Sequence, residues 1–179
     1  MTKTIFLDRD GTVIVDKDYL SSPLQVELEV GAAEGLSLLV AAGYRLIGVT
    51  NQSGVGRGYF TMGDVDACNR RVDELLAEHG VSLGGWFVCP HAPNEACACR
   101  KPRPGLLDQA MSVQKVDLGE SYVIGDKDSD VLLGESRGMR GVLVLSGSGR
   151  KHADWAQSSG RVIARNLLEA ARGIVAGRI

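Results

Sequence analysis

Short apolar runs alternate with longer segments of helical periodicity along the whole chain. The apolar runs have the length of buried strands and lie near 3–7, 44–49, 85–88, 121–125, 141–145 and 161–164. Strands that alternate with helices are typical of a mostly parallel sheet. We therefore expect a doubly wound α/β fold, with helices on both faces of one sheet.

Apolar spacing and capping signals predict the helices between these runs. One helix should run from about 32 to 42 and end at Gly43. A second should begin near Thr61, where Thr61 and Asp64 form the pattern of a capping box, and end near 79. Three more are expected after Pro104, after Asp128 and over about 166–176.

The connection over 11–31 shows little helical periodicity. A loop this long in a compact domain is usually functional. Because it begins where the first strand ends, we expect it to cover a site at that end. No insertion of domain size interrupts the chain, so residues 1–179 should form a single domain without a large cap.

Composition narrows the class of protein. The chain has 179 residues, 44% of them hydrophobic, and a net charge of −2, as in an ordinary globular domain. This charge gives no electrostatic reason to expect nucleic acid or membrane partners. The sequence lacks the pattern of a signal peptide and the long apolar stretch of a membrane span. We expect a cytoplasmic monomer whose four cysteines are thiols or metal ligands.

Two aspartates directly follow the first predicted strand. Asp8 and Asp10 are two positions apart, so in an extended chain their side chains lie on the same side. The carboxyl ends of strands are where open α/β sheets bind ligands. Two carboxylates this close repel each other unless a cation or a shared proton is present. The pair therefore predicts a cation site at this edge of the sheet.

Other segments supply complementary groups. Thr50 and Asn51 end the second predicted strand, and an acidic cluster over 126–130 follows the fourth. Arg100 and Lys101 supply cations, and Pro102 biases Lys101 towards an extended backbone. Carboxylates, a hydroxyl and a lysine are the groups that magnesium-dependent phosphoryl transfer requires.

The order of these motifs resembles that of the haloacid dehalogenase-type (HAD) phosphatases. The motifs are Asp-x-Asp-Gly-Thr at 8–12, then Thr50, then Lys101, then Gly-Asp-x-x-x-Asp at 125–130. The resemblance implies a HAD-like fold around a phosphate site. Thr50 and Lys101 would then hold the phosphoryl group and neutralise its charge.

The same resemblance implies roles for the acidic residues. Asp8 would be the nucleophile that forms an aspartyl-phosphate, and Asp10 the general acid and base. Mg²⁺ would be bound by Asp8, by Asp126 and by the backbone carbonyl of Asp10. Asp130 would bind a metal-bound water or orient Lys127. Substrate binding is expected from Asn51, Gln52, Ser53, Arg57, Arg100 and Lys127.

A second metal site is predicted between 89 and 99. Cys89, His91, Cys97 and Cys99 form the three-thiolate, one-imidazole set of a closed tetrahedral zinc site. A closed set leaves no position for water, so this Zn²⁺ should be structural. This ion should fix the conformation of the loop that leads into Arg100 and Lys101. The alternative is chance clustering of buried thiols.

Two glycine-rich stretches and one further cysteine carry weaker signals. The stretch over 54–58 fits neither common phosphate-loop pattern, and we interpret it as a flexible substrate loop. The stretch over 147–149 is interpreted as a turn. Cys68, within a predicted helix, is expected to be a core residue.

The Cys-x-His…Cys-x-Cys-Arg-Lys-Pro loop and Thr-Asn-Gln-Ser-Gly at 50–54 narrow the resemblance to two neighbouring phosphatase families. One family removes the 7-phosphate of D-glycero-D-manno-heptose 1,7-bisphosphate, which serves ADP- or GDP-heptose biosynthesis and hence lipopolysaccharide. The other acts on histidinol phosphate in histidine biosynthesis. A third alternative is a non-enzymatic, zinc-loop binding module on a phosphatase-like shell.

Charge near the expected site favours a bisphosphate substrate. Arg57, Arg100 and Arg103 are candidates for a second phosphate, since a planar guanidinium binds phosphate through two hydrogen bonds. Asp16 and Asp18 are the acidic candidates for an amine, and they suit sugar hydroxyls equally. We therefore expect the heptose family, with Arg100 as the best candidate for the distal phosphate.

Overall fold

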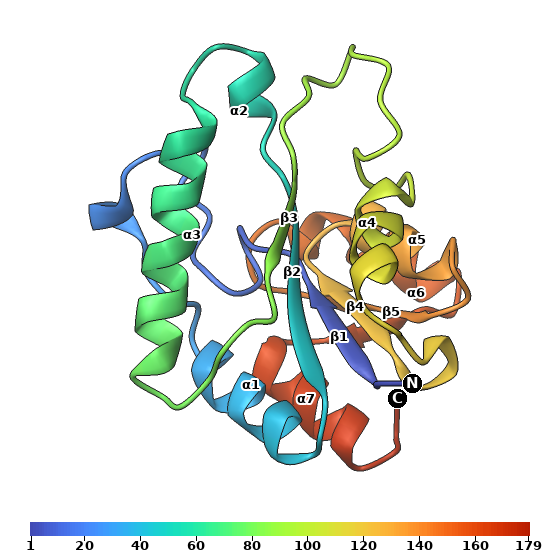
Figure 1. The fold of residues 1–179 in the computed structure, drawn as a ribbon. Helices are drawn as coiled ribbons and strands as arrows, with labels where there is room; N and C mark the ends of the chain where they lie inside the picture. The colour runs from blue at the N-terminus through green and yellow to red at the C-terminus, as the bar shows by residue number, and fades with distance from the viewer.

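A six-stranded parallel sheet lies between two layers of helices in the computed structural model, which describes all residues 1–179 (Figure 1). The strand order is β3-β2-β1-β4-β5-β6, and every neighbouring pair is parallel. The strands are β1 (Thr4–Leu7), β2 (Arg45–Asn51), β3 (Trp86–Cys89), β4 (Tyr122–Gly125), β5 (Arg140–Val144) and β6 (Val162–Ala164). The expected doubly wound fold is confirmed, with each strand within two residues of its expected place.

Seven α-helices connect and cover the strands. They are α1 (Ala32–Ala41), α2 (Ser53–Gly56), α3 (Met62–Ala77), α4 (Gly105–Val113), α5 (Asp128–Glu135), α6 (Ala153–Ser158) and α7 (Leu167–Val175). The five helices expected from the sequence are confirmed. Helices α2 and α6 were not expected from the sequence, because helices of four and six residues are too short to show an apolar period.

Alternation along the strands divides the core into two parts. Ile5 and Leu7 of β1 pack in the cluster that includes α1, α3 and α7. Phe6 points to the other face and packs in the cluster beneath α4 and α5. The two helix layers therefore follow from a strand that is apolar on both sides, as in other buried parallel sheets.

The expected capping box fixes the start of α3. The Thr61 hydroxyl accepts a hydrogen bond from the Asp64 amide at 3.2 Å, and the Asp64 carboxylate accepts one from the Thr61 amide at 2.8 Å. Such a cap stabilises a helix by roughly 1 kcal/mol. Cys68 in this helix is fully buried, as expected.

The connection after β1 forms a small antiparallel flap. The Val15 amide donates to the Glu27 carbonyl at 2.9 Å, and the Glu29 amide donates to the Val13 carbonyl at 3.0 Å. The Ile14 side chain beneath these bonds is fully buried and anchors the flap to the core. Residues 16–20 form the tip of the flap at the carboxyl edge of the sheet.

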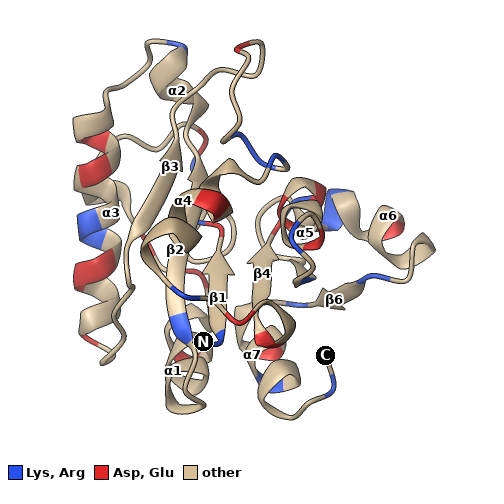
Figure 2. Ribbon diagram, turned by 45° about the vertical axis from the view of Figure 1, so that its right-hand side comes forward, with Lys and Arg blue, Asp and Glu red and all other residues tan.

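Charged residues of both signs are distributed over the helices, and α3 carries acidic and basic residues along its length (Figure 2). None of the helices combines the length and the apolar character that a membrane crossing requires.

Candidate active site and metal centre

Three buried carboxylates meet where β1 and β4 end. Asp8 directly follows β1, Asp126 directly follows β4, and Asp130 lies in the first turn of α5. Their carboxylate oxygens lie within 4.8 Å of one another, and none of the three residues is more than 5% exposed. β1 and β4 are neighbours at the point where the strand order reverses, which is where open α/β sheets bind ligands.

Lys101 lies between two of these carboxylates. Its Nζ is 2.6 Å from Asp8 Oδ1 and 2.6 Å from Asp130 Oδ1, and it donates to the Val49 carbonyl at 2.9 Å. Burial by itself would lower the pKa of Lys101, but the charges of Asp130 and Asp8 raise that pKa above its usual value. Lys101 is therefore a fixed positive charge. The structure places the Asp130 carboxylate beside Lys101, and Asp130 Oδ2 accepts a hydrogen bond from the Lys127 backbone amide at 3.1 Å. The Lys127 side chain lies nearer Asp126, with its Nζ 3.8 Å from Asp126 Oδ1.

A single buried lysine does not balance three carboxylates. Burial and the neighbouring Asp8 raise the pKa of Asp126 to about 7, and burial raises the pKa of Asp130 to about 6. Asp126 Oδ2 accepts a hydrogen bond from the Ser148 amide at 2.7 Å, but its Oδ1 is buried without a hydrogen-bond partner. An orphaned carboxylate oxygen in an all-oxygen cluster fits a hard divalent cation such as Mg²⁺.

Asp10 is held away from this cluster by other groups. Its Oδ2 accepts hydrogen bonds from Arg9 Nε at 3.1 Å and Gln52 Nε2 at 2.8 Å, and its Oδ1 accepts one from Arg9 Nη2 at 3.2 Å. The Asp10 side chain is 18% exposed, whereas that of Arg9 is fully buried. Asp10 is thus an oriented carboxylate with access to the cavity.

A polar cavity of about 170 Å³ opens beside these groups. Five carboxylates and two lysines line it, namely Asp8, Asp10, Asp16, Asp18, Asp130, Lys101 and Lys127. Asn51, Gln52 and Ser53 line the side formed by β2 and α2. Tyr19 of the flap also lines it, and its ring meets that of Tyr59 edge to face at 4.9 Å. The flap thus forms one wall of the cavity, as expected for the connection after β1.

Several expected site residues do not line this cavity, among them Asp126 and the candidate Arg103. Thr50 is fully buried, and its hydroxyl accepts a hydrogen bond from Gln52 Nε2 at 2.9 Å. Arg57 is exposed on the loop after α2. Arg100 is half-buried, and its Nη1 donates to the His91 carbonyl at 3.4 Å. Their proposed roles on the substrate remain predictions.

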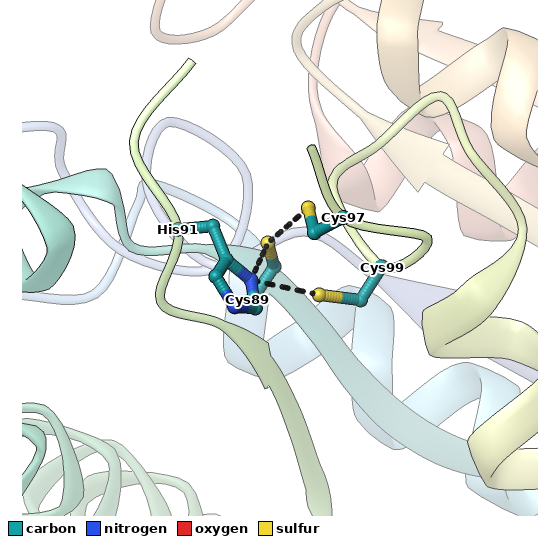
Figure 3. Close-up of side chains that lie close together, drawn as sticks. All are labelled: Cys89, His91, Cys97 and Cys99. Carbon is teal, nitrogen blue, oxygen red and sulfur yellow. Dashed lines mark hydrogen bonds between the residues drawn. The ribbon is translucent and has the colours of Figure 1, made fainter. Parts of the chain in front are cut away.

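The four predicted zinc ligands converge in space (Figure 3). Cys89 Sγ is 3.8 Å from Cys97 Sγ and 3.6 Å from His91 Nδ1, and Cys99 Sγ is 3.3 Å from His91 Nδ1. Tetrahedral Zn²⁺ with bonds of about 2.3 Å to sulfur and 2.0–2.1 Å to nitrogen separates its ligands by roughly 3.6–3.8 Å. All three cysteines are free thiols in the structure. The donor set and its spacing therefore fit one zinc ion.

This metal loop is tied to both neighbouring segments. The Gly56 amide of α2 donates to the Pro90 carbonyl at 2.8 Å, and the Gly105 amide of α4 donates to the Ala98 carbonyl at 3.0 Å. At its end, the Lys101 amide donates to Asn51 Oδ1 at 3.1 Å. The loop therefore joins the Cys/His cluster to the segment that carries Lys101.

Comparison with known proteins agrees with this geometry. A family model described as HAD-hydrolase-like matches residues 98–170. The D-glycero-beta-D-manno-heptose-1,7-bisphosphate 7-phosphatase of Helicobacter pylori is 42% identical, over 80% of this chain and 83% of its own length. That of Pasteurella multocida is 39% identical, over 89% of this chain and 93% of its own length. The chain belongs to the heptose-bisphosphate 7-phosphatase family.

A solved structure supports membership of the heptose-bisphosphate 7-phosphatase family at the level of the whole fold. The D,D-heptose 1,7-bisphosphate phosphatase of B. bronchiseptica, in a crystal structure complexed with magnesium and phosphate, superposes with a TM-score of 0.90. It is 32% identical and covers 98% of this chain, which covers 99% of it. The HAD-type resemblance expected from the sequence is confirmed, and the heptose family is favoured over the histidinol-phosphate family.

Within this heptose-phosphatase fold, the site includes residues that the sequence analysis missed. Arg9 fixes Asp10, and Asn69 fixes Arg9 in turn, through hydrogen bonds that no spacing rule predicts. Ser148, in the stretch interpreted only as a turn, holds Asp126 from the loop after β5. The available signals were an arginine placed between two site aspartates and a glycine-rich loop after a strand.

Proposed function

We propose that this protein is a Mg²⁺-dependent phosphatase that removes the 7-phosphate of D-glycero-D-manno-heptose 1,7-bisphosphate. The observation that carries the proposal is the convergence of Asp8, Asp126, Asp130 and Lys101 beside a polar cavity, in a chain whose relatives bear this activity in their names. Residues 1–179 would act as one domain, as a monomer in the cytoplasm, and serve ADP- or GDP-heptose formation.

The acidic cluster would hold the catalytic metal. Asp8, Asp126 and the backbone carbonyl of Asp10 would bind Mg²⁺, which fits the orphaned Oδ1 of Asp126. When bound, Mg²⁺ supplies positive charge that offsets the carboxylates and the phosphoryl oxygens. Lys101 adds a second fixed positive charge at Asp8.

The reaction would proceed in two displacements. The Asp8 carboxylate attacks phosphorus, the bond from phosphorus to the sugar oxygen breaks, and Asp10 gives that oxygen a proton. The phosphoryl group is then covalently bound to Asp8. Asp10, now ionised, takes a proton from water as the water attacks phosphorus and the bond to Asp8 breaks. Inorganic phosphate leaves, and both aspartates return to their starting states.

Substrate contacts would come from the walls of the cavity. Asn51, Gln52, Ser53 and Lys127 line it and would bind the phosphoryl group and the sugar. Thr50 would act beside Lys101 on the phosphoryl oxygens. Arg57 and Arg100, which lie outside the cavity lining, would reach the distal phosphate.

Turnover of the heptose bisphosphate by purified protein tests this function. We expect phosphate release that requires Mg²⁺, with ³¹P NMR showing loss of the 7-phosphate resonance and retention of the 1-phosphate resonance. Histidinol phosphate is the comparison substrate. A higher kcat/KM on histidinol phosphate would contradict the proposal, and binding of the bisphosphate without turnover would point to a binding module.

The Cys/His cluster is proposed to hold one structural Zn²⁺ per chain. We expect Cys97→Ser to remove the metal and raise KM for the bisphosphate, because the loop that positions Arg100 and Lys101 loses its anchor. Elemental analysis and kinetics check this together. Cys68→Ser is the matched control, since Cys68 lies in α3 and should leave the zinc content unchanged.

No zinc in protein purified without chelator would contradict this site. A native disulfide within the loop would contradict it as well. Cys89 and Cys99 pack in the smaller core cluster, which also contains Phe6 and Val123 of the central strands. Global unfolding on zinc loss is not expected, because the larger cluster, with Ile5, Leu7 and Ile124 of the same strands, contains none of the zinc ligands.

Arg100 is proposed to bind the distal phosphate. We expect Arg100→Ala to lower kcat/KM for the bisphosphate by roughly 10- to 100-fold, and to change kcat/KM for the 7-monophosphate of the same sugar far less, since a charged hydrogen bond contributes about 1.5–3 kcal/mol. Steady-state kinetics on the two substrates measure this. Arg70→Ala, on the exposed side of α3, is the control. Equal losses on both substrates would instead assign Arg100 to support of the metal loop.

A further inference from the structure

Arg9 is a fully buried arginine that does not touch the cavity. A buried guanidinium destabilises a fold unless its donors are satisfied. Each of its three nitrogens donates one hydrogen bond here: Nε and Nη2 donate to the two carboxylate oxygens of Asp10, and Nη1 donates to Asn69 Oδ1 at 2.9 Å. Two of the side-chain hydrogen bonds of Arg9 therefore hold Asp10, and the third, to Asn69, fixes the guanidinium that holds Asp10.

Asn69 is the second unusual feature of this network. It lies in the middle of α3, is 4% exposed, and shares its buried helix face with Val65, Cys68 and Val72. Its side-chain oxygen accepts from Arg9. An amide on an apolar helix face is retained only where it has a hydrogen-bond partner. Asn69 thus fixes the rotation of the planar guanidinium from the far side.

The hydrogen bonds from Arg9 and Gln52 leave Asp10 with one free acceptor site. An ionised carboxylate has about four lone-pair sites. Oδ2 accepts from both Arg9 Nε and Gln52 Nε2, so both of its sites are taken. Oδ1 accepts only from Arg9 Nη2, so one of its sites remains.

We infer that Arg9 is the positioning residue for the general acid and base, and that it holds Asp10 so that Oδ1 carries the catalytic proton. This inference rests on the proposed phosphatase reaction. In the first displacement, the Oδ1–H bond breaks and the proton passes to the sugar oxygen as that oxygen leaves phosphorus. Asp10 becomes a carboxylate whose new charge lies against the Arg9 guanidinium. In the second displacement, Oδ1 takes the proton back from the attacking water.

Replacing Arg9 by lysine distinguishes the positioning of Asp10 from simple charge balance. Arg9→Lys keeps the positive charge, but a single ammonium group cannot donate in a fixed fork to both oxygens and also reach Asn69. Asp10 would then rotate between orientations. The expected defect is in proton delivery and not in substrate binding, because Arg9 lies outside the cavity lining.

Leaving-group dependence gives the decisive measurement. A sugar alkoxide needs a proton to leave, whereas nitrophenolate leaves readily without one. We expect Arg9→Lys to lower kcat/KM for the heptose bisphosphate by about 10²-fold, and kcat/KM for p-nitrophenyl phosphate by less than about 10-fold, since general acid help is worth 10²–10⁴-fold. The ratio kcat/KM reports the first displacement, in which the leaving group departs.

Three further variants make the test independent of folding. Asn69→Leu leaves Arg9 in place but removes the acceptor for Nη1, and we expect the same selective loss at smaller size. Arg9→Lys combined with Asp10→Asn should be no worse than Asp10→Asn alone, because Arg9 acts through Asp10. Arg71, a partly exposed arginine on α3 paired with Glu74, provides the matched control: Arg71→Lys should change kcat/KM for neither substrate.

The outcomes separate the inference from the proposed function. If Asp10→Asn shows the leaving-group selectivity and Arg9→Lys and Asn69→Leu do not, the positioning role is wrong and the phosphatase proposal stands. Equal losses on both substrates, or additive losses in the double variant, would also overturn the positioning role. If the protein before substitution does not hydrolyse either ester with Mg²⁺, the proposed function itself fails.

Discussion

Replacement of Asp8 by asparagine is expected to abolish turnover and leave the fold intact. Asparagine is nearly isosteric and can still accept the hydrogen bond from Lys101 Nζ, but its amide oxygen does not attack phosphorus. In other covalent enzymes, loss of the nucleophile costs about 10⁶-fold in kcat, so a loss of at least about 10⁴-fold is expected here. Stopped assays on the heptose bisphosphate measure this loss of kcat, and circular dichroism checks that the variant is folded.

A covalent intermediate gives the complementary control. Acid quenching during turnover of ³²P-labelled bisphosphate should trap label on the native protein, and none on the Asp8→Asn variant. Mass spectrometry must exclude deamidation back to aspartate. Substantial turnover by verified Asp8→Asn protein would falsify the nucleophile assignment and move attention to Asp10 or Asp126.

Replacement of Lys101 by methionine is expected to reduce both activity and stability. Methionine fills a similar volume, but it leaves Asp8 and Asp130 without their shared cation. Removing one partner of a buried ion pair typically costs 3–5 kcal/mol, so Tm should fall. Loss of a charge that stabilises the transferred group should lower kcat by at least about 10²–10³-fold.

Thermal unfolding with and without Mg²⁺ measures the stability effect. Mg²⁺ should raise the Tm of Lys101→Met more than that of the native protein, because the cation offsets the unbalanced carboxylates. Lys151→Met is the matched control, since Lys151 is exposed after β5 and contacts none of the acidic cluster. An unchanged Tm for Lys101→Met would show that the three carboxylates do not depend on this lysine.

The sheet could be predicted from sequence because each of its strands is a compact apolar run bounded by polar or glycine residues. β1 is the clearest case, with four fully or nearly fully buried residues ahead of Asp8. Residues that end neighbouring strands meet at one edge by topology alone, so Asp8 and Asp126 could be named in advance. Lys101 lies on the loop between β3 and α4, and the motif order identified it. The Cys/His cluster could be named because its four ligands are close in sequence.

The groups that orient these residues could not be predicted in the same way. Arg9 bonds with Asn69, 60 positions away, and Ser148 reaches Asp126 from 22 positions away. Such contacts depend on how helices and loops pack, and an isolated arginine or serine carries no period. The position of Thr50 at the end of β2 could be predicted, but its full burial and the hydrogen bond that it accepts from Gln52 could not.

The small flap after β1, which forms one wall of the cavity, bears on how intermediates of this protein can be observed directly. Asp8 and Asp126 directly follow neighbouring parallel strands, so no rigid-body swing is needed to bring them together. We expect phosphate esters and metal ions soaked into preformed crystals to reach the cavity without cracking the lattice. A slow variant such as Asp10→Asn would then allow successive states of the reaction to be recorded in one crystal form.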